Sequence, residues 1–173
     1  KVGVTRLGFG AFERTVKSGS GQRDYLLYVG SRSGYKNFSG LIDGFASSSW
    51  LRGNFDLVCF GGGDFSDRER ELISKSGCAQ TQIRQTGGGD RELARSYREA
   101  AAFVYPSLYE GFGMPPLEAM SCDCPVVCSE RAAIPEVAGD AAEYFDPEEP
   151  NSIAAALERA LAPPRRAELV ERG

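Results

Sequence analysis

The sequence contains no histidine among its 173 residues. This absence excludes a Ser-His-Asp triad, a histidine general base and a histidine metal ligand made from the chain's own residues. An Asp-x-Asp sequence is also missing, so no close carboxylate pair suggests a Mg²⁺ site for a diphosphate. We therefore expect a site that works without a bound metal ion or another cofactor.

Long apolar runs and an excess of positive charge are missing as well. No apolar run approaches the roughly 18 residues of a membrane-spanning helix, and no signal peptide is visible at the N-terminus. The net charge of −4 argues against nucleic acid as the main partner. These features predict a cytoplasmic protein, in which any association with the inner membrane surface would be made by a part of the polypeptide outside this chain.

Cysteine is present but in an odd number, with five residues in a chain that is large enough to fold without disulfides. Reduced thiols are therefore the expected state. The spacing Cys122-x-Cys124-x3-Cys128 does not match the usual zinc patterns, and it leads directly into an apolar run. A zinc site is accordingly not predicted.

Short apolar runs alternate with helical patterns along most of the chain. Buried strands are predicted at 25–29, 56–60 and 102–105, a weak strand at 81–85, and further short strands at 125–128 and 143–145. Amphipathic helices are predicted around 38–45, 93–101 and 153–161. Ser66 and Glu69 form a capping box that opens another helix, and Asp90 is the expected N-cap of the second amphipathic helix. This alternation indicates an α/β fold with a doubly wound, Rossmann-like parallel sheet.

The stretch 110–120, Glu-Gly-Phe-Gly-Met-Pro-Pro-Leu-Glu-Ala-Met, follows one of these buried strands. Its prolines suit the first turn of a helix, and its glycines allow a sharp bend before that turn. The bend leaves backbone N–H groups uncovered beside the helix N-terminus, at Phe112, Gly113 and Met114. Such amides attract a phosphate or another anion.

Two carboxylates frame this anion site, Glu110 before the bend and Glu118 in the helix. Because carboxylates repel an anion, they are better suited to accept hydrogen bonds from neutral hydroxyl groups. A phosphate combined with many hydroxyls describes a nucleotide sugar, which is the ligand we predict. The alternative is an ordinary strand–helix turn whose glutamates are only solvated.

Two cations, Arg32 and Lys36, follow the first predicted strand. Since the carboxyl ends of parallel strands share one sheet edge, both cations could converge on the diphosphate of the same ligand. Arginine offers a planar fork for two phosphate oxygens, and lysine offers a compact charge. Taken alone, the two would be ordinary solvated charges of a surface loop.

Together these stretches resemble glycosyltransferase family 4. The similarity is carried by residues 28–37, 105–120, 124–127 and 135–137, and its most specific mark is the E-x7-E spacing from Glu110 to Glu118. The chain is similar to the C-terminal, donor-binding half of this family's two-domain GT-B fold. The resemblance implies an inter-domain crossover remnant or linker at 1–23, a nucleotide-sugar-binding domain at 24–162, and the start of a truncated C-terminal helix at 163–173.

The resemblance also implies roles for single residues. Arg32 and Lys36 would bind the donor diphosphate and stabilise it as it leaves. Glu110 would contact the donor sugar, and Glu118 would accept hydrogen bonds from the nucleotide ribose. The other implied donor-binding residues are Gly111, Phe112, Gly113, Met114 and Leu117. The family transfers a sugar with retention of configuration and without a metal, so the catalytic residues implied here are Arg32, Lys36 and Glu110.

The resemblance indicates the donor more closely than the acceptor. The sequence at 28–37 is similar to mannosyltransferases that use GDP-mannose, with UDP-glucose as the next choice. Residues 87–89 are all glycine where the family usually has a branched apolar residue near the nucleotide base, which leaves base contacts open. The acceptor could be a lipid-linked glycan, a polysaccharide or a small molecule. It would be bound by an N-terminal domain of the same polypeptide that is missing here, so this chain alone is expected to transfer nothing efficiently.

Two other classes of function fit parts of the pattern. A binding-only module could use the same pocket to sense or sequester a nucleotide sugar. Another GT-B enzyme, such as a nucleotide-sugar epimerase or a phosphorylase, is the second alternative. The E-x7-E stretch fits this second class poorly.

Overall fold

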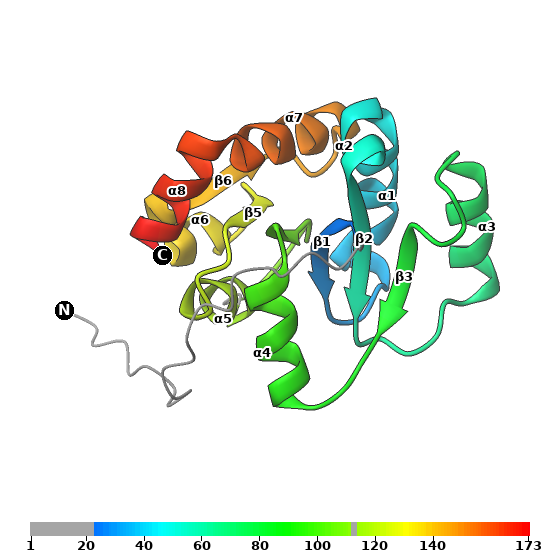
Figure 1. Ribbon diagram of the computed structural model, residues 1–173, viewed down its shortest axis with the longest axis horizontal. Helices are drawn as coiled ribbons and strands as arrows, with labels where there is room; N and C mark the ends of the chain where they lie inside the picture. The colour runs from blue at the N-terminus through cyan, green and yellow to red at the C-terminus, as the bar shows by residue number, and fades with distance from the viewer. Residues whose placement is uncertain (1–22, 112–113) are drawn as a thin grey trace.

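The computed structural model describes residues 23–111 and 114–173, which form a parallel sheet covered by helices on both faces (Figure 1). The sheet has six strands, namely β1 (Asp24–Val29), β2 (Phe55–Phe60), β3 (Ile83–Thr86), β4 (Ala102–Tyr105), β5 (Val126–Ser129) and β6 (Ala142–Phe145). All neighbouring strands pair in parallel. The predicted α/β class and parallel sheet are confirmed, with several strand ends shifted by one or two residues.

The strands lie in the order β3-β2-β1-β4-β5-β6. From β1 the sheet grows outward through β2 and β3, and the chain then returns to place β4 on the other side of β1. The position between β1 and β4 is therefore the topological switch point. Open α/β sheets bind their ligands at such a point, outside the carboxyl ends of the strands.

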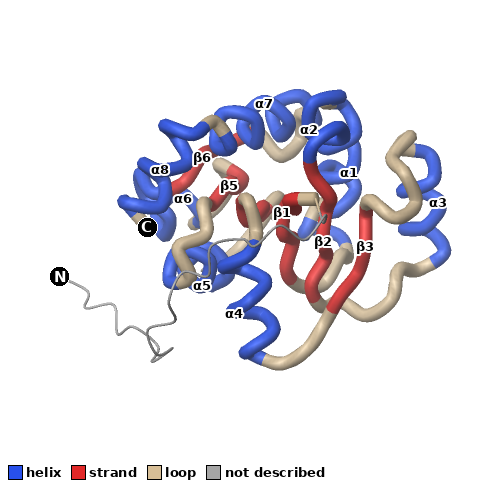
Figure 2. Tube along the Cα trace, in the orientation of Figure 1, coloured by secondary structure: helices blue, strands red, loops and turns tan. Residues whose placement is uncertain are grey.

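Alternate residues of each strand enter two separate cores, because successive side chains of a strand point to opposite faces. In β1, Leu26 and Tyr28 enter one core and Leu27 enters the other. The first core lies beneath α1 (Phe38–Ser47), α2 (Ser49–Asn54), α3 (Asp67–Lys75), α7 (Pro150–Leu161) and α8 (Pro163–Arg172). The second lies beneath α4 (Asp90–Glu99), α5 (Met114–Ser121) and α6 (Ile134–Ala138). Figure 2 shows the strands in red between helices in blue.

The helix starts follow the expected capping chemistry with one correction. At α3, the Ser66 hydroxyl accepts a hydrogen bond from the Glu69 N–H, and the Glu69 carboxylate accepts one from the Ser66 N–H, so the predicted capping box is confirmed. The prediction that Asp90 caps α4 is wrong by one residue. Gly89 is the N-cap, and its N–H donates to the Glu92 carboxylate. Asp90 is the first helical residue, where a negative charge suits the helix dipole.

The last two helices meet at a pair of prolines. α7 ends at Leu161, as predicted, and Pro163 and Pro164 form the first turn of α8. Leu169 of α8 is only 1% exposed and lies in the core beneath α1 and α7. α8 therefore packs onto the same unit as the sheet.

The short helices α2 and α6 were not predicted, because a helix of one or two turns has too few residues to establish a period. The sequence pattern also favours an edge strand at 2–6 and a flexible loop at 17–22, and both segments lie outside the described residues. In the part of the chain that the structure describes, no helix has the length and apolar character needed to cross a membrane.

Candidate functional site

The segments that follow β1 and β4 meet at the switch point of the sheet. After β1 the chain forms the short helix η1 (Gly34–Lys36), and after β4 it continues through residues 106–111. The Leu108 N–H donates to the Tyr35 carbonyl over 2.8 Å, which fixes the two segments against each other. Asn37 has a left-handed φ of 52° and donates from Nδ2 to the Pro147 carbonyl over 2.7 Å. The segments after β1, β4 and β6 are therefore joined into one edge.

Lys36 and Glu110 form an ion pair across this junction, so the structure brings these two predicted site residues together. Lys36 Nζ lies 2.7 Å from Glu110 Oε1, and the side chains are 16% and 13% exposed. The rings of Tyr35 and Tyr105 lie 5.3 and 5.4 Å from the ammonium, within the range of cation–π contacts. The switch point thus carries a cation and an anion that water screens only weakly.

The surroundings of Glu110 keep its carboxyl group ionised. Partial burial by itself raises the pKa of Glu110, but the combined effect of Lys36, Ser107 and Tyr105 outweighs burial and holds this pKa below its usual value. Burial, and then the Glu110 carboxylate, raise the pKa of the Tyr105 phenol well above its ordinary value. The phenol therefore stays protonated and can donate a hydrogen bond.

The hydroxyl groups of Tyr105 and Ser107 are buried beside the Glu110 carboxylate. Tyr105 is 2% exposed and Ser107 is 0% exposed. Neither oxygen makes a hydrogen bond of ordinary geometry with a described residue, although both lie close enough to the carboxylate to lower the pKa of Glu110. Buried polar atoms in folded proteins are nearly always paired, so two unpaired hydroxyls at one carboxylate are unusual. Sequence reasoning had assigned neither residue a role.

Glu118 extends from α5 and is oriented by α4. Its Oε2 accepts a hydrogen bond from the Tyr97 hydroxyl over 3.3 Å. Tyr97 is 1% exposed and packs edge-on against Phe103 of β4, with 5.3 Å between ring centroids. Burial, and then the charge of Glu118, raise the pKa of Tyr97, so its hydroxyl remains a donor. In the sequence, Tyr97 is recognisable only as part of the apolar face of its helix.

The other predicted donor-binding residues lie between the two glutamates. Gly111 and Met114 are exposed, and Leu117 is partly buried in α5. Phe112 and Gly113 lie outside the described residues. The helix predicted after the glycines is confirmed as α5, with both prolines of the stretch in its first turn.

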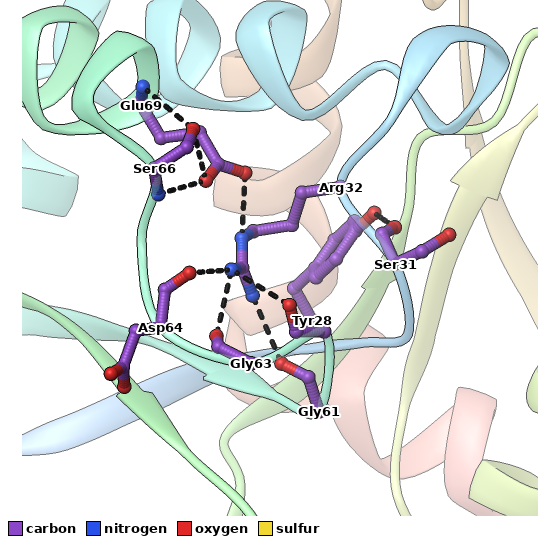
Figure 3. A network of polar contacts seen from close by, with 9 residues as sticks. Tyr28, Ser31, Arg32, Gly61, Gly63, Asp64, Ser66 and Glu69 are labelled. Atoms are coloured by element: carbon purple, nitrogen blue, oxygen red, sulfur yellow. Dashed lines mark hydrogen bonds and ion pairs between the residues drawn. The ribbon is translucent and has the colours of Figure 1, made fainter.

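Arg32 is buried among backbone carbonyls of the turn that follows β2 (Figure 3). Its Nε donates to Glu69 Oε1 over 2.8 Å, and its Nη1 donates to the Gly61 carbonyl over 2.9 Å. Its Nη2 donates to the carbonyls of Gly63 and Asp64 over 2.8 and 3.0 Å. Only 2% of the Arg32 side chain is exposed.

The turn after β2 is shaped around this guanidinium. Gly61, Gly62 and Gly63 all have positive φ values, of 83°, 70° and 70°. A Cβ atom on Gly62 would lie 2.7 Å from Arg32 Nη1. Burial alone raises the pKa of Glu69, but its hydrogen bonds from Ser66 and Arg32 bring that pKa below its usual value. The three glycines therefore allow the carbonyls to surround a buried cation.

Among the described residues, Arg32 and Lys36 therefore contact different partners, and their convergence on the diphosphate of one ligand stays a prediction. The difference has a physical reason. A planar guanidinium with five N–H donors matches a ring of carbonyls and a carboxylate, whereas a lysine ammonium does not. The N–H groups of Arg32 are used within the turn after β2.

Metal-binding side chains do not gather in the part of the chain that the structure describes. Within 23–111 and 114–173, no three or more carboxylate or thiol side chains are arranged to hold a metal ion. The five cysteines are all free, and burial raises the pKa of Cys59 and Cys124 to about 12. Such thiols are protonated at neutral pH, which makes them inert.

Comparison with known proteins identifies relatives of this chain. The family model described as glycosyl transferases group 1 matches residues 12–173. O-antigen chain mannosyltransferase B of Escherichia coli is 38% identical over 139 residues, which are 79% of this chain and 36% of that protein. O-antigen chain mannosyltransferase RfbU of Salmonella typhimurium is 30% identical over 137 residues, which are 79% of this chain and 38% of that protein.

Solved structures show the same arrangement of strands and helices. Sucrose-phosphate synthase from Thermosynechococcus elongatus superposes with a TM-score of 0.75 at 26% identity, over 88% of this chain and 40% of that one. The chain therefore spans less than half the length of the curated relatives and of the solved structure that it matches.

Proposed function

The chain belongs to the glycosyl transferases group 1 family, and we propose that it binds the nucleotide-diphosphate sugar from which such an enzyme transfers a sugar. The observation that carries this proposal is the Lys36–Glu110 pair at the switch point between β1 and β4. A cation for a diphosphate and a carboxylate for sugar hydroxyls lie side by side at the edge where such folds bind ligands.

In this proposal each polar residue of the edge contacts a different part of the donor. Lys36 binds the diphosphate, and the backbone N–H groups of Phe112, Gly113 and Met114 are proposed as further ligands of it. Glu110 accepts hydrogen bonds from hydroxyls of the sugar, and Glu118, oriented by Tyr97, accepts them from the ribose. Met114 and Leu117 contribute to the wall of the donor site, and Gly111 leaves room beside it. Arg32 acts indirectly, by holding the turn after β2, since diphosphate contact would require it to leave its present partners.

Catalysis follows from the charges at this edge. As the sugar–phosphate bond breaks, negative charge grows on the departing diphosphate, and Lys36 and the α5 amides stabilise it there. Positive charge grows on the sugar beside the carboxylate of Glu110. We propose that transfer proceeds with retention of configuration and without a metal ion.

GDP-mannose is the donor we favour, with UDP-glucose next, because the two curated relatives described above are named mannosyltransferases. An acceptor-binding domain is proposed to precede this chain in the same polypeptide, since the relatives are more than twice as long as the part that matches. The reaction is proposed to serve polysaccharide synthesis on the cytoplasmic side of the membrane.

The experiment that tests this function is a calorimetric titration of the chain with GDP, UDP, GDP-mannose and UDP-glucose, with Mg²⁺ and with EDTA. We expect binding that prefers one base and does not change with Mg²⁺. Absence of binding to all four ligands would contradict the proposal. Binding that is abolished by EDTA would contradict its metal independence.

A nucleotide-sugar-binding module without catalysis remains the second candidate. It would bind the same ligands but would not hydrolyse or transfer the sugar in the full polypeptide that carries the chain. The partly buried ammonium of Lys36 beside Glu110 favours the enzyme, because a sensor has less need of a charge that stabilises a leaving group.

A further inference from the structure

Building on the proposed function, we propose that Tyr105 and Ser107 are positioning residues that take over the Glu110 carboxylate when Lys36 turns from Glu110 to the donor diphosphate. In this exchange, Lys36 pairs with Glu110 until the donor binds. The two hydroxyls, which lie beside the carboxylate without a hydrogen bond of ordinary geometry to a described residue, complete one when Lys36 leaves.

Charge repulsion opposes contact of Lys36 with Glu110 and a diphosphate at the same time. Lys36 Nζ lies 2.7 Å from Glu110 Oε1. A diphosphate that bound the same ammonium without displacing this contact would lie within a few ångströms of the carboxylate, in a place that water screens weakly. Repulsion between the two anions therefore opposes simultaneous contact. The flexible stem of lysine allows the ammonium to turn toward the stronger anion.

The two hydroxyl groups lie where water does not reach them. Tyr105 is the last residue of β4 and is 2% exposed, and Ser107 is fully buried. Both already lie close enough to Glu110 to lower the pKa of its carboxyl. A carboxylate accepts several hydrogen bonds at once, and loss of the Lys36 contact frees one position on Oε1. A small rotation of the Glu110 side chain would complete both hydroxyl contacts.

Tyr105 can contact Lys36 while it is paired with Glu110, and can contact Glu110 after Lys36 has turned to the diphosphate. Its ring lies 5.4 Å from the Lys36 ammonium, so its aromatic face helps to hold the cation while the pair is closed. Its hydroxyl remains protonated, because burial and the neighbouring carboxylate raise its pKa. It therefore has a proton to donate to Glu110 once the ammonium has moved.

The exchange predicts that removal of a charged residue of the site strengthens the binding of a diphosphate. If Glu110 competes with the diphosphate for Lys36, Glu110→Gln removes the competitor and strengthens the binding of a nucleoside diphosphate that lacks the sugar. Conversely, Tyr105→Phe and Ser107→Ala weaken the binding of the nucleoside diphosphate, because the Glu110 carboxylate that Lys36 releases has lost its replacement hydrogen-bond donors. These losses exist only while residue 110 is charged.

The experiment is a double-mutant cycle measured by calorimetric titration of the chain with GDP and with UDP. We expect Glu110→Gln to bind the preferred diphosphate about three- to tenfold more tightly, and Tyr105→Phe and Ser107→Ala to bind it about three- to tenfold more weakly, the size of one hydrogen bond. In the Glu110→Gln background, Tyr105→Phe should change the affinity less than about twofold. Tyr25→Phe is the matched control, because Tyr25 is a partly buried tyrosine of β1 whose hydroxyl donates to the Ser96 carbonyl, and its effect should not depend on residue 110.

The outcomes separate the exchange from the proposed function. Failure of the wild-type chain to bind either diphosphate overturns both. Binding by the wild-type chain, together with weaker binding by Glu110→Gln, overturns the exchange alone. An equal loss of affinity from Tyr105→Phe in both backgrounds assigns the hydroxyl a merely structural role and also overturns the exchange. If Tyr105→Phe does not fold, Ser107→Ala tests the exchange independently.

Discussion

Arg32 and Lys36 both follow β1, and both side chains have little contact with solvent, at 2% and 16% exposure. Their partners differ in kind. Arg32 is surrounded by carbonyl oxygens and Glu69, which fix its position from several directions. Lys36 has a single carboxylate partner and two aromatic neighbours, which leave its ammonium free to exchange. At this scale, the number of partners decides which cation is available to a ligand.

Replacement of Arg32 tests this distinction. We expect Arg32→Ala to lower the free energy of unfolding by about 1.5–3 kcal/mol, because Glu69 Oε1 and the Gly61 carbonyl lose a charged donor, while Glu69 Oε2 keeps its hydrogen bonds from Ser66. Arg32→Lys should restore little, since an ammonium lacks the planar fork. Arg70→Ala, at a residue whose side chain is 62% exposed on α3, is the control and should have little effect. Denaturant unfolding measures all three. Unchanged stability with lost diphosphate affinity would instead make Arg32 a direct ligand.

Glu118 and Tyr97 provide a second test among single residues. Glu118→Ala should weaken the binding of GDP or UDP by roughly 1–3 kcal/mol, because it removes a charged acceptor for the ribose hydroxyls. Tyr97→Phe should weaken binding less, since it only releases the orientation of that carboxylate. Glu99→Ala on the exposed side of α4 is the control. An unchanged affinity in Glu118→Ala would remove the proposed ribose contact.

At the scale of helices and strands, Glu143 joins three elements. From β6 it accepts hydrogen bonds from Arg159 of α7 over 2.7 Å and from Arg165 of α8 over 2.9 Å. Burial by itself raises the pKa of Glu143, but the two arginines together bring it below its ordinary value of 4.5. Together with the buried Leu169, these ion pairs hold α8 against the sheet.

The pH dependence of stability should report this junction. Because the pKa of Glu143 is lower in the folded protein than in the unfolded chain, its ion pairs stabilise the fold above about pH 4.5, and this stabilisation is lost as the pH falls through the folded-state value. As the pH is lowered from 7 to 3, the free energy of unfolding should therefore fall less steeply for Glu143→Gln than for the wild type. Glu171→Gln, at an exposed residue of α8, is the control. Parallel pH curves for wild type and Glu143→Gln would contradict this assignment.

At the scale of the whole molecule, the fold could be predicted because most strands are short apolar runs followed by a helical period, with β3 (Ile83–Thr86) the polar exception. This alternation permits few arrangements besides a parallel, doubly wound sheet. The place where the candidate residues meet could be predicted for the same reason, because the carboxyl ends of the strands share one edge. Lys36 and Glu110, which are 74 residues apart in sequence, indeed meet there.

The direction of each side chain could not be predicted in this way. Nothing in the pattern tells a cation that faces a ligand from one that a neighbouring turn encloses, as the three glycines after β2 enclose Arg32. The same holds for Tyr105 and Ser107, which read as the end of a strand and the start of a loop until their buried, unpaired hydroxyls are seen beside Glu110. These properties depend on contacts between segments that are distant in sequence.

The central claim is that the switch point binds a nucleotide-diphosphate sugar through Lys36. The most direct measurement compares the affinity of the wild-type chain, Lys36→Met and Lys75→Met for GDP-mannose. Lys75 is 73% exposed on α3, away from the switch point, so it is the matched lysine control. We expect Lys36→Met to lose roughly 10- to 150-fold in affinity, the value of one charge-assisted hydrogen bond, and Lys75→Met to bind like the wild type. Equal affinity of folded Lys36→Met and the wild type would contradict the claim.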